Sequence, residues 1–230
     1  IYTDDEYLIA EKCSVIPLEI VVRGYMTGST NTSLWTHYNK GDREYCGLKF
    51  RDGYNKNQQL DMPVITPTTK GINDIPITSN EIIGQNYLLE NEWKYISEKA
   101  IELFIFGQQE ASKKGLILVD TKYEFGWLNN KIILIDELHT CDSSRYWVKS
   151  SYNERFGNSL EPEKMDKDAI RDWVKQHCDP YNDPIPKVPE EVISNVENVY
   201  NKYHKLLTNN AVEKNSNINI DNLIVNYFMD

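Results

Sequence analysis

The pattern of apolar and charged positions from residue 116 to residue 124 is the most informative in the chain. Residues 116–119 form an unbroken apolar run, which is typical of a strand buried on both faces. Charged side chains then occupy alternate positions, and the two-residue period of a strand places Asp120, Lys122 and Glu124 on one face. Such groups at a buried strand are costly unless they are paired or bind a metal ion. We therefore predict a functional site here, with a structural ion pair at the strand end as the alternative.

A second apolar run, at residues 131–135, predicts a return strand that completes a hairpin. The connecting residues 128–130 include two asparagines, which tolerate the left-handed backbone that a tight turn needs. This pairing brings Asp136 opposite or diagonal to Glu124, within reach of one shared cation. The hairpin therefore predicts two carboxylates that converge.

The chain before this hairpin predicts strands followed by a long connection. Residues 7–10 and 15–22 have the apolar character of strands. Proline cannot donate to a strand ladder, so Pro17 indicates an edge strand or a crossover. Residues 31–79 are rich in Gly, Asn, Asp and Pro, and they predict a long and mostly irregular excursion.

Helices are expected before the hairpin and throughout the chain after residue 147. Capping residues, glycine stops and apolar positions at helical spacing indicate where they run. Pro189 suits the first turn of the last helix, and Glu190 and Glu191 suit its positive N-terminal dipole. The expected helices run from Ser79 or Asn80 to about Lys114 with Gly115 as the stop, from Glu163 to Gln176, and from Pro189 along a stripe of Val192, Val196, Val199, Tyr203 and Leu206.

The composition narrows the functional class. The chain has 230 residues, a hydrophobic fraction of 40% and a formal net charge of -10, which argues against general nucleic-acid binding. No apolar run reaches the length of a membrane span, and no signal peptide opens the chain. The four cysteines and four histidines are scattered, so we expect reduced thiols in a cytoplasmic protein and no zinc site. The oligomeric state is not defined by the sequence.

Two arginines lie in segments that are suited to anions. Arg23 precedes residues 24–30, where two glycines and three hydroxyl residues offer backbone N–H groups to an anion; an ordinary turn is the equal alternative. Arg145 follows serines in a predicted turn, where it either holds a phosphate or neutralises Asp136 or Asp142. By its own chemistry, Lys70 is expected to be a solvated surface lysine.

Two longer segments resemble the signatures of the SAICAR synthetase family, the phosphoribosylaminoimidazole-succinocarboxamide synthases. They are Val15-Ile-Pro-Leu-Glu-Ile-Val-Val-Arg-Gly-Tyr-Met-Thr-Gly-Ser29 and Leu118-Val-Asp-Thr-Lys-Tyr-Glu-Phe-Gly126. The similarity covers about residues 8–207 and looks like the longer, eukaryote-type form with extra C-terminal helices. Further matching segments are Pro67–Lys70, Phe106–Gln108, Ser144–Trp147 and Asp166–Trp173.

The resemblance implies a reaction and a fold. The reaction is the ATP-dependent joining of L-aspartate to the carboxylate of CAIR, the carboxylated aminoimidazole ribonucleotide, to give SAICAR, ADP and phosphate. The route implied is an acyl phosphate, which needs no side-chain nucleophile. The fold implied is α+β and two-lobed, with a kinase-like ATP-grasping arrangement and an antiparallel sheet flanked by helices.

The resemblance also implies roles for individual residues. Hard oxygen ligands such as those predicted at the hairpin are the kind that Mg²⁺ prefers. The roles implied are Glu124 and Asp136 for Mg²⁺, Lys122 and Asp120 for catalysis, Arg23, Ser29, Lys70 and Arg145 for substrate binding, and Glu11, Cys13 and Val15 for the hinge against which adenine lies.

The family normally begins with a Gly-Lys-rich segment that covers the ATP phosphates, and no counterpart precedes Tyr7. The first residue is Ile1 rather than Met, so we expect a chain that starts inside a longer protein or has been processed. The domains expected are a remnant of the N-terminal lobe and hinge at 1–22, a catalytic domain at 23–207 and an Asn-rich tail at 208–230.

Two other functions fit part of the pattern. One is a catalytically silent module that binds CAIR without a complete ATP site. The other is a kinase-like phosphotransferase with a different acceptor, although the chain contains no His-Arg-Asp catalytic loop.

Overall fold

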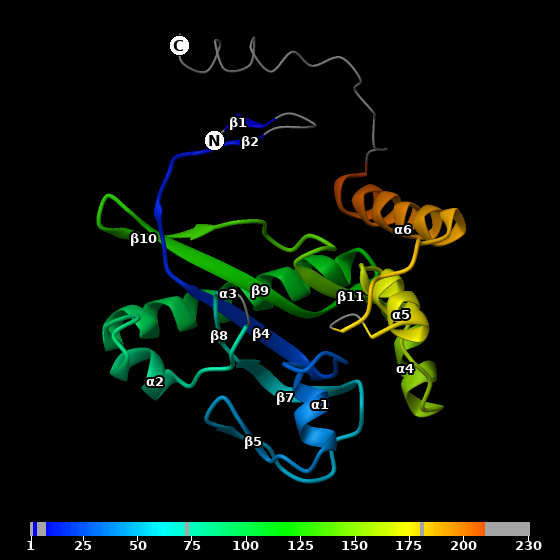
Figure 1. Cartoon of the computed structure of the whole chain (residues 1–230), viewed down its shortest axis with the longest axis horizontal. Helices are drawn as coiled ribbons and strands as arrows, with labels where there is room; N and C mark the ends of the chain where they lie inside the picture. Colours follow the sequence, from blue (N-terminus) through cyan, green and yellow to red (C-terminus); the bar gives the residue numbers. More distant parts are fainter. Residues whose placement is uncertain (1, 4–7, 72–73, 180–181, 210–230) are drawn as a thin grey trace.

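The computed structural model describes residues 2–3, 8–71, 74–179 and 182–209, and it shows an α+β fold (Figure 1). Its centre is a seven-stranded antiparallel sheet with the strand path β10-β9-β4-β7. The fold class predicted from the sequence is confirmed. These strands are β4 (Leu18–Met26), β7 (Gln58–Ile65), β9 (Leu116–Leu128) and β10 (Lys131–Ile135), with β3 (Ser14–Val15) and β11 (Ser144–Val148) also on β9 and β8 (Thr68–Thr69) on β4.

Strand β9 changes partners along its length, and this change positions the site. Along one edge it pairs with β4 over residues 120–123 and then with β3 over residues 126–127. Along its other edge it pairs with β11 over residues 116–121 and with β10 over residues 124–128. The segment between β10 and β11 therefore leaves the sheet beside Lys122 and Tyr123.

A β-bulge in β9 sets which side chains face the core. Arg145 pairs with Asp120, but the next residue of β11 pairs with Leu118, so Val119 is the extra residue. Leu118 before the bulge and Tyr123 after it both belong to the main core cluster. They are five positions apart and would point to opposite faces of an unbroken strand, so the bulge reverses the alternation of faces and turns Asp120, Lys122 and Glu124 away from the core helix.

The long helix α3 (Glu90–Lys113) packs across the sheet and supplies the main core (Figure 1). Its buried residues Ile96, Ala100 and Phe104 contact the apolar side chains of β4 and β9. A second, smaller core of Met26, Leu34, Leu60 and three tyrosines lies around α1 (Leu34–Asn39). The remaining elements are β1 (Tyr2–Thr3), β2 (Leu8–Ile9), β5 (Glu44–Tyr45), β6 (Leu48–Lys49), α2 (Ser79–Gly84), α4 (Lys149–Gly157), α5 (Asp168–His177) and α6 (Glu190–Thr208).

The hairpin and the last helix agree with the sequence prediction. Asn129 and Asn130 both have positive φ angles, 49° and 61°, and β10 covers residues 131–135 as expected. Helix α6 begins after Pro189, carries acids in its first turn and buries Tyr203. Among the described residues, no helix combines the length and the apolar character that a membrane span requires.

Other predicted elements were wrong in their extent. Residues 31–79 contain α1 and the eight-residue strand β7, which the sequence did not indicate, although most of the described residues of this segment are irregular as predicted. The single helix predicted for residues 79–114 is two helices, because the chain turns at Asn86 (φ 59°) and buries Leu88 in the core. Thr78, and not Ser79 or Asn80, is the N-cap of α2.

Three further predictions need correction. Arg145 lies in strand β11 and not in a turn. Sequence reasoning missed this strand. The helix expected from Glu163 begins only at Asp168, because Met165 N–H donates to the carbonyl of Tyr146 and keeps this part extended. Strand β4 is internal, and Pro17 lies in the break between β3 and β4, so of the two alternatives given for this proline the edge strand was wrong.

The domain boundaries stay a prediction. Strand β4 continues across the expected boundary at residues 22 and 23. Most of the expected tail, residues 210–230, lies outside the described residues.

Replacing Thr78 by Ala should destabilise the protein by about 1 kcal/mol, because the Thr78 hydroxyl accepts a hydrogen bond from the Glu81 backbone N–H at the start of α2. Urea unfolding followed by circular dichroism measures the change. Thr78→Ser keeps the hydroxyl and should retain most of the stability. Equal losses in both variants would contradict the role of the cap.

Candidate active site

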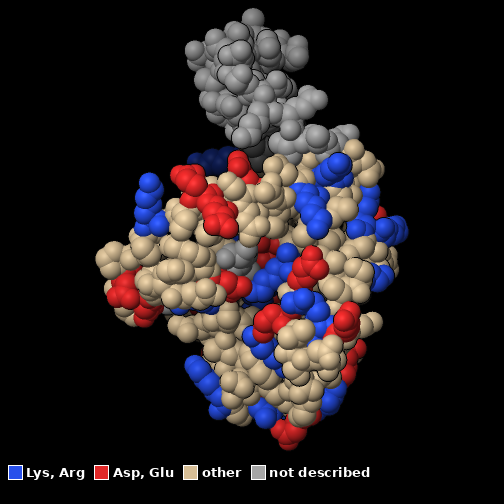
Figure 2. Space-filling view, turned by 90° about the vertical axis from the view of Figure 1, so that its right-hand side faces the viewer, with Lys and Arg blue, Asp and Glu red and all other residues tan. Residues whose placement is uncertain are grey.

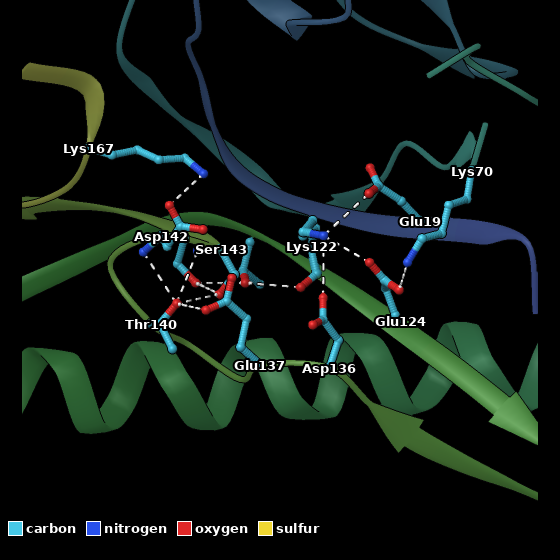
Figure 3. A network of polar contacts seen from close by, with 12 residues as sticks. Glu19, Lys70, Lys122, Glu124, Asp136, Glu137, Thr140, Asp142, Ser143 and Lys167 are labelled. Atoms are coloured by element: carbon cyan, nitrogen blue, oxygen red, sulfur yellow. Dashed lines mark hydrogen bonds and ion pairs between the residues drawn. The ribbon is translucent and has the colours of Figure 1, made fainter. Parts of the chain in front are cut away.

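Two clusters of charged side chains lie side by side where β9 pairs with β4. The first is centred on the Lys122 ammonium, whose Nζ is 2.8 Å from Glu124 Oε1, 3.3 Å from Glu19 Oε1 and 3.4 Å from Asp136 Oδ2 (Figure 3). Lys70 Nζ contacts the other oxygen of Glu124. Both oxygens of this buried carboxylate are therefore paired with ammonium groups.

The surroundings of the first cluster keep its groups charged. Burial alone would lower the pKa of Lys122, but the hydrogen bond to Glu124 and the charge of Glu19 outweigh it and raise that pKa. Burial alone would raise the pKa of Asp136, but the backbone N–H of Glu137 and the Lys122 ammonium outweigh it and lower that pKa. Near neutral pH, Asp136 is therefore ionised beside a protonated Lys122.

The second cluster consists of Asp120 between two arginines. Asp120 Oδ2 lies 3.3 Å from Arg145 Nη1 and 4.0 Å from Arg23 Nη1. Arg23 is itself fixed, since its Nε donates to Thr66 Oγ1 at 2.7 Å and its Nη2 donates to the Thr32 carbonyl at 3.0 Å. Two guanidinium groups beside one carboxylate make this end of the site attractive to an anion.

The second cluster lines one cavity of about 270 Å³ together with Glu19 and Lys122 of the first. Figure 2 shows basic and acidic side chains intermixed around a hollow on the face that lies to the right in Figure 1. A neighbouring cavity of about 330 Å³ contains Ser29, and Arg145 borders both cavities. The far wall of the first cavity includes Asp142, Ser143, Asp166, Lys167 and Arg171.

The structure brings most of the predicted site residues together. Asp120, Lys122, Arg23 and Arg145 line one cavity, and Glu124, Asp136 and Lys70 join it through the contacts of Lys122 and Glu124. Lys70 is thus not a purely solvated lysine. Arg145 forms an ion pair with Asp120, which was not among the partners that the sequence suggested. The roles of all these residues stay predictions.

Ser29 and the expected hinge lie apart from the two clusters. Ser29 Oγ accepts a hydrogen bond from Lys175 Nζ at 2.7 Å in the neighbouring cavity. Cys13 is half-buried with its Sγ against Gly126, and Val15 is 51% exposed beside the same strand. Glu11 is exposed on the segment that leads to β3.

Sequence reasoning missed Glu19 as a site residue. It lies on β4 two residues before Val21 and four before Arg23, and all three side chains line the cavity. The two-residue period that selected the charged positions of β9 would have found Glu19 on β4 as well. Arg171 was also missed, although it falls inside a segment that resembles the family.

The carboxylates of the first cluster fit a divalent ion shared with phosphate. Within the described ranges, no group of three His, Cys, Asp or Glu residues forms a metal site of its own. Glu124 and Asp136 both reach the single Lys122 Nζ atom, so one oxygen of each lies within reach of one cation. Mg²⁺ is typically bound by one or two carboxylates together with water and substrate phosphates. The donor set is therefore suitable for Mg²⁺.

Comparison with known proteins now places the chain in a family. The family model described as SAICAR synthetase matches residues 2–188. The chain belongs to the SAICAR synthetase family. The family predicted from the two signature segments is thus confirmed.

The relatives and solved structures agree with this assignment. The chain is 55% identical over 193 residues to the chloroplastic phosphoribosylaminoimidazole-succinocarboxamide synthase of Vigna aconitifolia, covering 83% of this chain and 57% of the relative. It is 48% identical over 217 residues to the synthase of Legionella pneumophila strain Lens, covering 93% of this chain and 70% of the relative. The SAICAR synthase of Saccharomyces cerevisiae complexed with SAICAR has a TM-score of 0.70 and 31% identity, covering 88% of this chain and 64% of that chain.

Proposed function

We propose that this chain takes part in the ATP-dependent joining of L-aspartate to the carboxylate of CAIR, which gives SAICAR, ADP and phosphate. The names of its relatives support this reaction. The chain spans 57% of the Vigna relative's length, so the activity of the whole protein is part of the proposal. The observation that carries the proposal is the Lys122 cluster beside the Arg23–Asp120–Arg145 cluster in one cavity.

The first step makes the CAIR carboxylate reactive. A carboxylate oxygen of CAIR attacks the γ-phosphorus of ATP, and the bond from that phosphorus to the bridging oxygen of ADP breaks. Mg²⁺, when bound by Glu124 and Asp136, would neutralise phosphate charge. The Lys122 ammonium is already at the site and adds a further positive charge near the transferring group.

The second step forms the new amide. The amine nitrogen of L-aspartate attacks the carbonyl carbon of the acyl phosphate, the carbon–oxygen bond to phosphate breaks, and the proton that the amine loses passes to the departing phosphate. No side-chain nucleophile is needed, because phosphate is already the leaving group. The task of Asp120, Lys122 and Lys70 is to orient the reacting groups and balance their charge.

The arginine cluster is proposed to hold the anionic nucleotide CAIR. Arg23 and Arg145 present guanidinium groups from adjacent positions on either side of Asp120. Ser29 extends this surface into the neighbouring cavity, which shares Arg145. Adenine is proposed to lie against residues 11–15, beside the hairpin that carries Glu124. A cytoplasmic location stays a prediction, and the Vigna relative is named chloroplastic.

Coupled ADP release with Mg-ATP, CAIR and L-aspartate tests the reaction directly. Release that requires all three substrates is the expected result. Saturable CAIR binding by calorimetry without ADP release would instead favour a silent CAIR-binding module. ADP release that continues without L-aspartate would contradict a ligase.

Glu124→Gln and Asp136→Asn should each lower kcat by about 100-fold or more, because each replaces a charged oxygen ligand by a neutral amide. Steady-state ADP release measures the effect, and circular dichroism checks the fold. Asp52→Asn is the matched control, since Asp52 is exposed and pairs with Arg43 far from the cavity. Normal turnover in both site variants would show that the assigned metal ligands are wrong.

Arg23→Ala should weaken CAIR binding by about 10-fold or more, through the loss of hydrogen bonds from a charged donor. Isothermal calorimetry with CAIR measures the affinity. Arg23→Lys keeps the charge but loses the fork of donors, so its loss should be intermediate. Arg43→Ala removes an exposed arginine and should leave the affinity unchanged. An unchanged affinity in Arg23→Ala would assign Arg23 a structural role.

A further inference from the structure

The segment between β10 and β11 holds Asp136 at the site in an unusual backbone conformation. Asp136 has a φ angle of 66° and His139 one of 55°, so two non-glycine residues of this short segment are left-handed. Such conformations persist only where the surrounding structure determines them, and they gather at functional sites. The contacts of His139 show what determines this segment.

His139 is fixed by three tyrosines from three different elements. Its Nε2 lies 2.6 Å from Tyr123 Oη of β9 and shares a hydrogen bond with it. Its backbone carbonyl accepts a hydrogen bond from Tyr146 Oη of β11 at 2.8 Å and another from Tyr203 Oη of α6. Burial lowers the pKa of His139 to about 4, so the ring is neutral near neutral pH.

Helix α3 makes room for the His139 ring at Gly107. A Cβ atom at Gly107 would lie 2.4 Å from Cε1 and 2.8 Å from Nδ1 of His139. Glycine in the middle of a helix is unfavourable relative to alanine, so its presence here accords with the close approach of the ring. Gly107 is buried and lies well inside α3.

Two neighbouring residues of β9, Lys122 and Tyr123, contact the segment between β10 and β11 from opposite faces of the sheet. Lys122 contacts the Asp136 carboxylate on the cavity side, and Tyr123 contacts His139 on the core side. The rest of the segment is closed by Thr140, whose hydroxyl donates to Glu137 Oε2 at 2.7 Å and accepts from the Ser143 N–H at 3.1 Å. A displacement of His139 therefore has a short path to Asp136.

We propose that His139, seated on Gly107 and bound by Tyr123 and Tyr203, is a positioning residue that holds the Asp136 carboxylate against Lys122. The consequence for Mg²⁺ rests on the proposed function, whereas the position of Asp136 does not. The arrangement also connects α6 to the candidate metal site through Tyr203, although α6 contributes none of the cavity-lining residues described above.

Crystal structures of Gly107→Ala and Tyr123→Phe test the positioning role. In the first variant the new methyl group displaces the ring, and in the second the hydroxyl that binds His139 is lost. The distance from Asp136 Oδ2 to Lys122 Nζ, 3.4 Å here, should increase beyond the roughly 4 Å limit of an ion pair, while Lys70 stays on Glu124. Gly84→Ala and Tyr152→Phe are matched controls. A Cβ at Gly84 meets no atom within 4 Å, and Tyr152 Oη donates to the Asn57 carbonyl away from this segment.

Mn²⁺ binding in the presence of ADP, followed by electron paramagnetic resonance, gives a second readout. The dissociation constant for Mn²⁺ should rise about 10-fold in Gly107→Ala and Tyr123→Phe and stay unchanged in both controls. In Gly107→Ala/His139→Asn, the shorter side chain removes the clash with residue 139, the end of the flexible Leu118 side chain, 2.8 Å from the new Cβ, has to shift in both Gly107 variants, and asparagine tolerates the left-handed backbone. Thermal stability should recover there while Mn²⁺ affinity stays low, which a merely structural role of His139 would not produce.

Two outcomes would overturn the inference. An Asp136 carboxylate that stays within ion-pair distance of Lys122 in Gly107→Ala and Tyr123→Phe would remove the positioning role. If Mn²⁺ affinity recovers together with thermal stability in the double variant, His139 contributes only to packing and does not position Asp136. The proposed function can fail independently of this inference. If the unaltered chain releases no ADP, the distance from Asp136 Oδ2 to Lys122 Nζ in the crystal structures still decides whether His139 positions Asp136.

Discussion

The buried carboxylate of Glu124 is the group on which the rest of the site depends. Its side chain is 3% exposed, and removing a carboxylate from water is costly unless a cation lies close to it. Lys122 serves one oxygen from the same strand, and Lys70 serves the other from the segment that follows β8. The contact between Lys70 and Glu124 depends on two strand pairings, that of β8 with β4 and that of β4 with β9. Loss of these cations would leave a buried charge without compensation, so the ion pairs and the order of the sheet support each other.

The long strand β9 places the charged side chains of the candidate site on one surface. Its bulge at Val119 lets Leu118 and Tyr123 both join the core, although an unbroken strand would point them to opposite faces. The same bulge aims Asp120 and Lys122 into the cavity. The exchange of β11 for β10 along one edge then opens the gap through which residues 136–143 pass. One irregularity and one change of partner therefore place carboxylates from two separate segments around a single lysine.

Local patterns were sufficient to predict the parts of the fold that depend on neighbouring residues. The hairpin at 129–130 follows from two asparagines between apolar runs, and the convergence of Glu124 and Asp136 follows from the hairpin. The charged face of β9 was predicted from its two-residue period. The family resemblance added the roles that chemistry alone left open, such as that of Lys70.

The missed features depend on contacts between distant residues. Nothing local shows that β9 is long enough to pair with β11 as well as β10, so residues 144–148 did not indicate a strand. The helix break before residue 90 lacks proline, and it forms because Leu88 is buried in the core. The excursion at 31–79 builds its core largely from tyrosines, which the aliphatic patterns used for strands and helices do not detect. The β9 bulge likewise becomes visible only from its pairing with Arg145 and Tyr146.

The two clusters differ in sign, and this difference makes one small cavity suitable for both a cation and anions, as the proposed function requires. In the contacts around Glu124, the carboxylates of Glu19, Glu124 and Asp136 outnumber the two ammonium groups. In the contacts around Asp120, two guanidinium groups outnumber the single carboxylate. A low-dielectric wall strengthens both fields, and the side chains that create them are already ordered by the sheet. A ligand with a metal-bound phosphate at one end and a separate anionic group at the other would therefore meet complementary charge along its length without a large rearrangement of the strands.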